Sequence, residues 1–222
     1  MRKTFEDELS SLHNHFSEMG MIVNEAIYKS VKSFITHDKR LAKEVIDQDY
    51  QINDIELTLE KKCFELIALQ QPVTGDLRRI VTVMKACVDL ERMGDHAVSI
   101  AKSTIRVKGT KRISHIEEKI DQLSQEVKET VNLVLEAYLK KDSDQAIKIV
   151  KSDERINTLS REIFEQCIEE MKADPEIVIG GTDYLLVSKY LERIGDYVTN
   201  ICEWIVYLET GKITELNSNH SL

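Results

Sequence analysis

A six-residue motif occurs twice in this chain, as LERMGD at residues 90–95 and as LERIGD at residues 191–196. Further matches extend outward from it. Asp49, Ile52 and Cys63 have counterparts 104 residues later, Pro72 has one 103 residues later, and the motif itself recurs after 101. Short insertions or deletions at two turns account for this drift. The chain therefore consists of two copies of one unit.

The composition favours helices in both copies. The 222 residues include only 2 prolines and 8 glycines, and aromatic residues make up 6% of the chain. Sheets need more frequent turn residues and are rich in β-branched and aromatic side chains. A hydrophobic content of 42% is ordinary for a globular chain and argues against long disordered tails.

Apolar residues recur at steps of three and four, which is the pattern of amphipathic helices. Six helices are expected, with apolar faces that run from Phe5 to Ile35, Leu41 to Leu66, Ile80 to Ile100, Ile120 to Tyr138, Ile149 to Ile163 and Leu185 to Ile205. Each half then holds three long helices. The predicted fold is all-α, with two tandem antiparallel three-helix bundles over residues 1–108 and 112–222 and a linker at 108–112.

Several residues predict where these helices begin and end. Asp38, Asp142 and Asp174 are expected as N-caps, the last one followed by Pro175 at the first helical position. The residue before Pro72 should leave the helical conformation and end the second helix. Two further expectations are a capping box formed by Ser114 and Glu117 and an irregular segment at residues 180–181.

Charge and cysteine content limit the partners and the compartment. The 30 basic and 39 acidic residues give a net charge of −9, which disfavours nucleic acid as a partner. No apolar run approaches the length of about 20 residues that spans a bilayer, and the acidic residues near the start do not resemble a signal peptide. The four cysteines are widely spaced and are expected to be buried, reduced thiols of a cytoplasmic protein.

The repeated motif places two carboxylates four residues apart on one helix face, Glu91 with Asp95 and Glu192 with Asp196. Like charges at this spacing repel each other unless a cation lies between them. A glycine in the middle of a helix costs roughly 1 kcal/mol relative to alanine. Something close to the motif must occupy the space beside that glycine, either a neighbouring helix or a ligand.

A second polar pair is repeated on the preceding helix of each half, Asp49 with Asn53 and Asp153 with Asn157. Carboxylate and amide oxygens without cysteine or histidine in register suit hard cations such as magnesium, manganese, calcium or iron, and argue against structural zinc. The predicted metal ligands are Asp49, Asn53, Glu91, Asp95, Asp153, Asn157, Glu192 and Asp196. The plainer alternative is a solvated acidic patch whose glycines only permit close helix packing.

Signatures of common enzyme classes are missing from the sequence. It contains no P-loop, no G-x-S-x-G, no H-E-x-x-H and no dinucleotide-binding glycine motif. It also lacks the E-x-x-H of di-iron carboxylate bundles. The chain is therefore expected not to be an enzyme.

Two three-helix repeats, each with L-E-R-x-G-D on its third helix and Asp-x-x-x-Asn on its second, resemble the PhoU family over about residues 5–211. The resemblance implies a regulator that restrains phosphate uptake and the phosphate-starvation response. It also implies metal binding at the motif acids, with the ion left open among divalent or trivalent iron, manganese, magnesium and zinc. Asn53 and Asn157 depart from the family pattern, in which the second position is acidic.

The implied partners are the ATPase subunit of a phosphate ABC transporter and a two-component sensor kinase. A cytoplasmic homodimer that meets the membrane only through its partners is expected. The alternative is a metal-buffering or structural helical accessory protein of another phosphate carrier, without signalling output. A metal-dependent hydrolase is a third interpretation.

Overall fold

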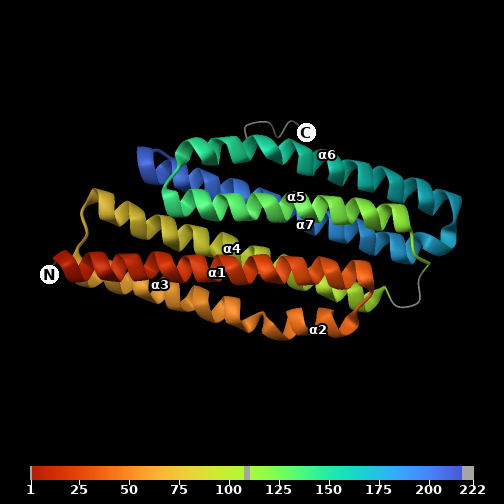
Figure 1. Ribbon diagram of the computed structural model, residues 1–222, viewed down its shortest axis with the longest axis horizontal. Helices are drawn as coiled ribbons and strands as arrows, with labels where there is room; N and C mark the ends of the chain where they lie inside the picture. The colour runs from red at the N-terminus through yellow and green to blue at the C-terminus, as the bar shows by residue number, and fades with distance from the viewer. Residues whose placement is uncertain (1, 108–110, 217–222) are drawn as a thin grey trace.

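The computed structural model describes residues 2–107 and 111–216, with side chains from Phe5 onward, and these ranges contain helices but no strand. The chain is arranged as one elongated body (Figure 1). The elements are α1 (Arg2–Thr36), α2 (Lys39–Gln48), α3 (Tyr50–Gln70), α4 (Thr74–Arg106), α5 (Ser114–Lys140), α6 (Ser143–Ala173), the short 3-10 helix η1 (Pro175–Ile177) and α7 (Val178–Thr210).

The predicted pair of three-helix bundles is confirmed. In the first bundle α1 and the consecutive helices α2 and α3 pack against α4, and in the second α5 and α6 pack against α7. The two bundles lie side by side, with α4 against α7 and α1 against α5 (Figure 1). The linker predicted at 108–112 lies partly outside the described residues, which exclude 108–110.

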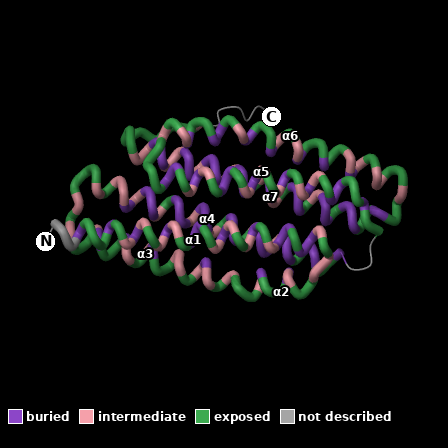
Figure 2. The backbone as a smooth tube through the Cα atoms, viewed as in Figure 1, coloured by how far each residue is buried: buried purple, intermediate pink, exposed green. Residues whose placement is uncertain are grey.

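A single apolar core extends through both bundles. Buried residues follow the inward stripes of all the long helices and meet along the middle of the body (Figure 2). Phe16 and Phe34 of α1 are almost fully buried, and so is Tyr184 of α7, which meets Phe34 edge to face. Neither bundle therefore has a closed core of its own.

Helix ends follow the predicted capping chemistry at most positions. The Asp38 carboxylate accepts hydrogen bonds from the backbone N–H groups of Arg40 and Leu41, and Asp142 accepts one from Gln145. Asp174 caps η1, with Pro175 as its first residue. Gln71, directly before Pro72, adopts a left-handed conformation with φ of 47° and ends α3.

Two expectations about single helices are wrong. The second helix is not continuous, because a turn at Asp49 separates α2 from α3, while its counterpart α6 runs unbroken through Asp153. The predicted irregularity at Gly180 and Gly181 is also absent, since both residues are helical and the irregular turn is η1, a few residues earlier. Gly181 packs so closely on Met171 of α6 that a β-carbon would collide with it.

The predicted capping box of α5 does not form, because Glu117 has other partners. Its carboxylate accepts hydrogen bonds from Tyr184 Oη at 2.8 Å and Arg112 Nη2 at 2.7 Å, and lies 3.1 Å from His37 Nε2. Arg106, at the end of α4, forms an ion pair of 2.6 Å with Asp183 of α7. These contacts join the two halves at one end of the body.

The four cysteines, Cys63, Cys87, Cys167 and Cys202, are buried and free, as predicted. Burial raises the pKa of the Cys63 thiol to about 12, which keeps it protonated and unreactive. None of the helices in the described ranges is long and apolar enough to cross a bilayer.

Candidate metal centres

The repeated motifs occupy the middle of α4 and α7, where these two helices lie against each other. The ring of His96 on α4 stacks with two rings of α7. The distance between ring centroids is 5.5 Å to Tyr190 and 5.7 Å to Tyr197. Nearby, Asn200 Nδ2 donates a hydrogen bond of 3.1 Å to Asp89 Oδ1. His96 thus serves the contact between the two halves.

A neighbouring helix fills the space beside each motif glycine. A β-carbon at Gly94 would lie 2.8 Å from Ile52 Cδ1 and 3.9 Å from Asp49 Oδ1. At Gly195 it would lie 3.2 Å from Asp153 Oδ1 and 3.3 Å from Ile156 Cδ1. Glycine thus lets the preceding helix approach closely and brings its aspartate beside the motif.

In each half, the Asp and the Asn of the repeated Asp-x-x-x-Asn pair are hydrogen bonded to each other. Asn53 Nδ2 donates to Asp49 Oδ2 at 3.3 Å, and Asn157 Nδ2 donates to Asp153 Oδ2 at 2.9 Å. The structure therefore brings the predicted residues together in two groups: Asp49, Asn53, Glu91 and Asp95 between α3 and α4, and Asp153, Asn157, Glu192 and Asp196 between α6 and α7. We call these groups the first and the second acidic site.

Mutual repulsion is strong in the first acidic site. Burial raises the pKa of Glu91 to about 7, and the charges of Asp95, Glu56 and Asp49 add to the effect. The pKa of Asp49 is raised by burial and then by Asp95, while Asn53 and Lys102 act in the opposite direction. Ionisation of these carboxylates beside one another is unfavourable. A cation bound between them would favour their ionised form.

Two further carboxylates, Glu56 and Glu60, which comparison of the repeats does not select, lie beside the first acidic site on α3. Glu56 is one turn beyond Asn53 on α3, and its pKa is raised by burial, by Glu60 and by Asp95. The counterparts of Glu56 and Glu60, 104 residues later, are Ser160 and Phe164, neither of which is acidic. The signal that identifies Glu56 and Glu60 is their own i and i+4 spacing on the helix that carries Asp49 and Asn53.

The second acidic site is partly neutralised by its own residues. Glu192 accepts a hydrogen bond of 3.0 Å from Ser160 Oγ and one of 2.7 Å from Lys189 Nζ. Arg193 Nη1 lies 3.3 Å from Asp196 Oδ2. Burial and then Asp153 raise the pKa of Asp196, and Arg193 opposes the shift.

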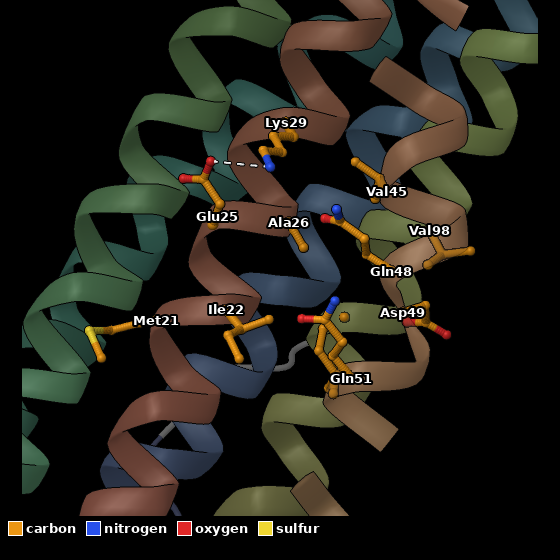
Figure 3. A pocket seen from close by; sticks show the side chains of 12 residues that line it. Met21, Ile22, Glu25, Ala26, Lys29, Val45, Gln48, Asp49, Gln51 and Val98 are labelled. Atoms are coloured by element: carbon orange, nitrogen blue, oxygen red, sulfur yellow. Dashed lines mark ion pairs between the residues drawn. The ribbon is translucent and has the colours of Figure 1, made fainter. Parts of the chain in front are cut away.

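A pocket of about 270 Å³ opens beside Asp49, between α1, the α2–α3 turn and α4. Its lining is mainly apolar and includes Ile22, Val45 and Val98 (Figure 3). The ion pair between Lys29 and Glu25, 3.7 Å apart, lies at its edge. This apolar surrounding accounts for the burial that raises the pKa of Asp49.

The donor set of both sites suits a hard cation, since it consists of carboxylate and amide oxygens. Across the described residues, no three His, Cys, Asp or Glu side chains already converge on a common point. Holding an ion would require the side chains of each site to turn toward it. Rotation of this kind is open to the long Glu91 and Glu192 side chains at the helix surface.

The fold and the paired acidic sites define a class of all-helical proteins in which a three-helix unit is duplicated and carries its acidic motif on the third helix. The family model of the PhoU domain matches this chain twice, over residues 16–104 and 113–205. The chain therefore belongs to the PhoU family.

Two similar proteins are themselves named as PhoU homologs. The phosphate-specific transport system accessory protein PhoU homolog of Clostridium acetobutylicum is 39% identical over 217 residues, which cover 97% of this chain and 99% of that protein. The homolog of Streptococcus pneumoniae is 36% identical over 98% of this chain and 100% of its own length.

Two solved structures have the same fold. The phosphate transport system regulatory protein PhoU from Streptococcus pneumoniae superimposes with a TM-score of 0.89 at 35% identity, covering 95% of this chain and 99% of that one. PhoU from Pseudomonas aeruginosa gives a TM-score of 0.89 at 28% identity, covering 94% of this chain and all of that one.

Proposed function

We propose that this protein regulates phosphate uptake and phosphate homeostasis as a non-enzymatic, metal-binding adaptor. Membership of the PhoU family, whose relatives are named as accessory proteins of phosphate-specific transport, supports an accessory role in phosphate transport. The observation that carries the finer proposal is the doubled acidic site, one between α3 and α4 and one between α6 and α7.

In this proposal each acidic site binds divalent or trivalent cations, with iron, manganese, magnesium and zinc as the ions to test. Burial and then the charges of neighbouring acids raise the pKa values of Asp49, Glu91 and Asp196, and a bound cation would offset both by favouring the ionised carboxylates. Bound cations also add positive charge to the site, which would attract phosphate or an acidic surface of a partner. Metal loading would thus decide whether the surface at each acidic site attracts or repels an acidic partner.

The partners proposed are the ATPase subunit of a phosphate ABC transporter and a two-component sensor kinase. The protein would act in the cytoplasm as a homodimer and reach the membrane only through these partners, without binding nucleic acid. Long helices with exposed outer faces offer extended docking surfaces for such contacts. The expected output is repression of the phosphate-starvation response when phosphate is abundant.

The test removes the motif acids of both sites, with Glu91→Ala, Asp95→Ala, Glu192→Ala and Asp196→Ala in one variant. We expect loss of bound metal in the purified protein, and derepression of a phosphate-starvation reporter at high phosphate in its host. Capture of the transporter ATPase and the kinase by the wild-type protein should differ between high and low phosphate. A matched control is Glu165→Ala with Glu169→Ala, because these exposed acids have the same i and i+4 spacing on α6.

The outcomes separate the candidate functions. Unchanged metal content and unchanged regulation would contradict the proposal. Loss of metal with unchanged regulation would instead favour the metal-buffering or structural accessory role at another phosphate carrier. Phosphatase activity with added manganese or magnesium that disappears in the four-residue variant would identify a hydrolase.

A further inference from the structure

The outer face of α3 carries three large, exposed apolar side chains in one line. Tyr50, Leu57 and Phe64 are 60%, 63% and 56% exposed and are spaced by seven residues. Residues seven apart lie on the same side of a helix, two turns from one another. We call this set the α3 stripe.

The repeat does not require such a stripe. In α6, the counterpart helix of the second half, the positions 104 residues later hold Glu154, Arg161 and Ile168, and the first two are exposed and charged. An apolar row in water is unfavourable unless something covers it, and no segment of the described chain does so. The stripe is thus a property of the first half that the fold does not explain.

The stripe is complementary to itself. Its three apolar residues are placed symmetrically about Leu57, so an antiparallel second copy aligns Leu57 with the partner's Leu57 and Tyr50 with the partner's Phe64. Asp54 and Lys61 are exposed on one flank of the stripe, about one turn before and one turn after Leu57. The same alignment places each Asp54 beside the partner's Lys61, so that two pairs of opposite charges meet along this flank.

We propose that the α3 stripe is a two-fold interface on which a second copy of this chain packs its own α3 in antiparallel orientation. A two-fold interface must be self-complementary, and the stripe meets this condition both in its apolar order and in its charges. The proposal rests on the homodimer included in the proposed function and assigns it a surface, but it depends neither on metal nor on transporter partners.

The interface has a defined position relative to the acidic sites. Asn53, Glu56 and Glu60 lie beside the stripe on α3 and face α4, so the first acidic site borders the interface. Helices α3 and α6 lie on opposite sides of the body (Figure 1). The second acidic site therefore stays accessible to a different partner in the dimer.

One helix pair gives a small interface, below the size of about 1,200–2,000 Å² that is typical of stable complexes. We therefore expect a dissociation constant in the micromolar range. Sedimentation velocity of the full chain, with chelator present, should show a monomer that converts to a dimer between about 1 and 100 μM.

The first variant to test is Leu57→Glu, which puts two like charges at the centre of the interface. Leu57 is exposed, so this change should leave the fold intact, and we expect a monomer throughout the same concentration range. The matched control is Leu139→Glu on α5, where the leucine is 56% exposed and away from the stripe. This control should dimerise like the wild-type protein.

Cysteine cross-linking tests the orientation. With copper phenanthroline as the oxidant, Leu57→Cys should form a disulfide-linked dimer by itself, whereas Tyr50→Cys should cross-link only when mixed with Phe64→Cys. The four native cysteines are buried and should not compete. In addition, Asp54→Lys should weaken the dimer about tenfold, and adding Lys61→Asp should restore it.

A wild-type monomer at all concentrations, or a Leu57→Glu variant that dimerises normally, would overturn the proposal. A dimer that resists Leu57→Glu would leave the homodimer in place and refute only this surface. The regulatory function is measured separately, by the reporter response to the motif variants, so its failure is distinguishable from failure of the interface.

Discussion

The two halves of this molecule share one backbone plan and one acidic motif, yet they treat the motif glutamate differently. In the described part of the chain, no hydrogen bond or ion pair holds the Glu91 carboxylate, and its acidic neighbours outweigh Arg92 in their effect on its pKa. Glu192, at the same place in the second half, is held by Ser160 and Lys189. Both halves keep the repeated site residues at corresponding places, whereas the charge balance around them differs.

The difference has a physical meaning for ion binding. The first acidic site has additional negative charge from Glu56 and Glu60 beside it, and Arg92 and Lys102 offset the resulting repulsion only in part. The second has Lys189 and Arg193 beside its carboxylates, so an incoming cation must compete with charges already present. The first site should therefore gain more from binding than the second.

The largest expected effect is a difference in metal affinity between the two sites. Titration of the metal-free protein with Mn²⁺ at pH 7.5 should show two classes of site that differ at least about tenfold, or about 1.4 kcal/mol. Glu91→Gln with Asp95→Asn should abolish the tighter class, and Glu192→Gln with Asp196→Asn the weaker class. Equal affinities would remove the proposed distinction between the halves.

The next effect concerns the pH dependence of stability in the metal-free protein. Because the folded-state pKa of Glu91 is about 7, above its ordinary value of 4.5, the folded protein holds the extra proton between these pH values. The contribution of protonated Glu91 to the free energy of unfolding is complete below pH 4.5 and is lost as the pH rises through about 7. Metal-free protein should thus lose stability from this group on going from pH 5 to pH 8.

Removal of this charge should reverse the loss. We expect Glu91→Gln to raise the free energy of unfolding at pH 8 by about 1–2 kcal/mol, allowing for solvent screening, and to flatten its pH dependence. Glu192→Gln is the control, since it removes a negative charge that already accepts hydrogen bonds from Ser160 and Lys189, and it should not stabilise. Urea denaturation with chelator at several pH values measures both, and equal behaviour of the two variants would contradict the contrast.

The smallest expected effect comes from the motif glycines. An alanine at position 94 would meet the buried Ile52 Cδ1 at 2.8 Å, a distance that forces a shift, whereas at position 195 the nearest atom is 3.2 Å away. The gain in helix propensity offsets part of the crowding. We expect Gly94→Ala to destabilise by about 1 kcal/mol and Gly195→Ala to be close to neutral in urea denaturation, and the reverse order would show that Ile52 moves more freely than Asp153 and Ile156.

The fold could be predicted from the sequence because its signals are local and occur twice. Helical periodicity, the caps at Asp38, Asp142 and Asp174, and Pro72 each depend on residues close together in the chain. The turn at Asp49 could not be predicted, because this residue keeps nearly helical torsion angles, with φ of −55° and ψ of −33°. The capping box was predicted wrongly because Glu117 is bound by His37 and Tyr184, which are distant in sequence.

The candidate sites were predictable only in the part that both halves retain. Asp49, Glu91 and their counterparts are repeated, and the structure places them together. Glu56 and Glu60 have no acidic counterparts, so a comparison of repeats passes over them. The pairing of Glu192 with Lys189 and Ser160 depends on the choice of side-chain conformers across two helices, which the sequence pattern does not determine. Metal binding itself stays a prediction.

The shared core has a consequence for the origin of the chain. A single three-helix unit would expose the apolar side of its third helix, the side that α4 and α7 now bury against each other. An ancestral protein with one unit could have covered that side with a second copy of itself, in the antiparallel arrangement that His96 and Tyr197 now mark. Fusion of two such copies into one chain would make the contact permanent and independent of concentration, and would free each copy to change its own charges.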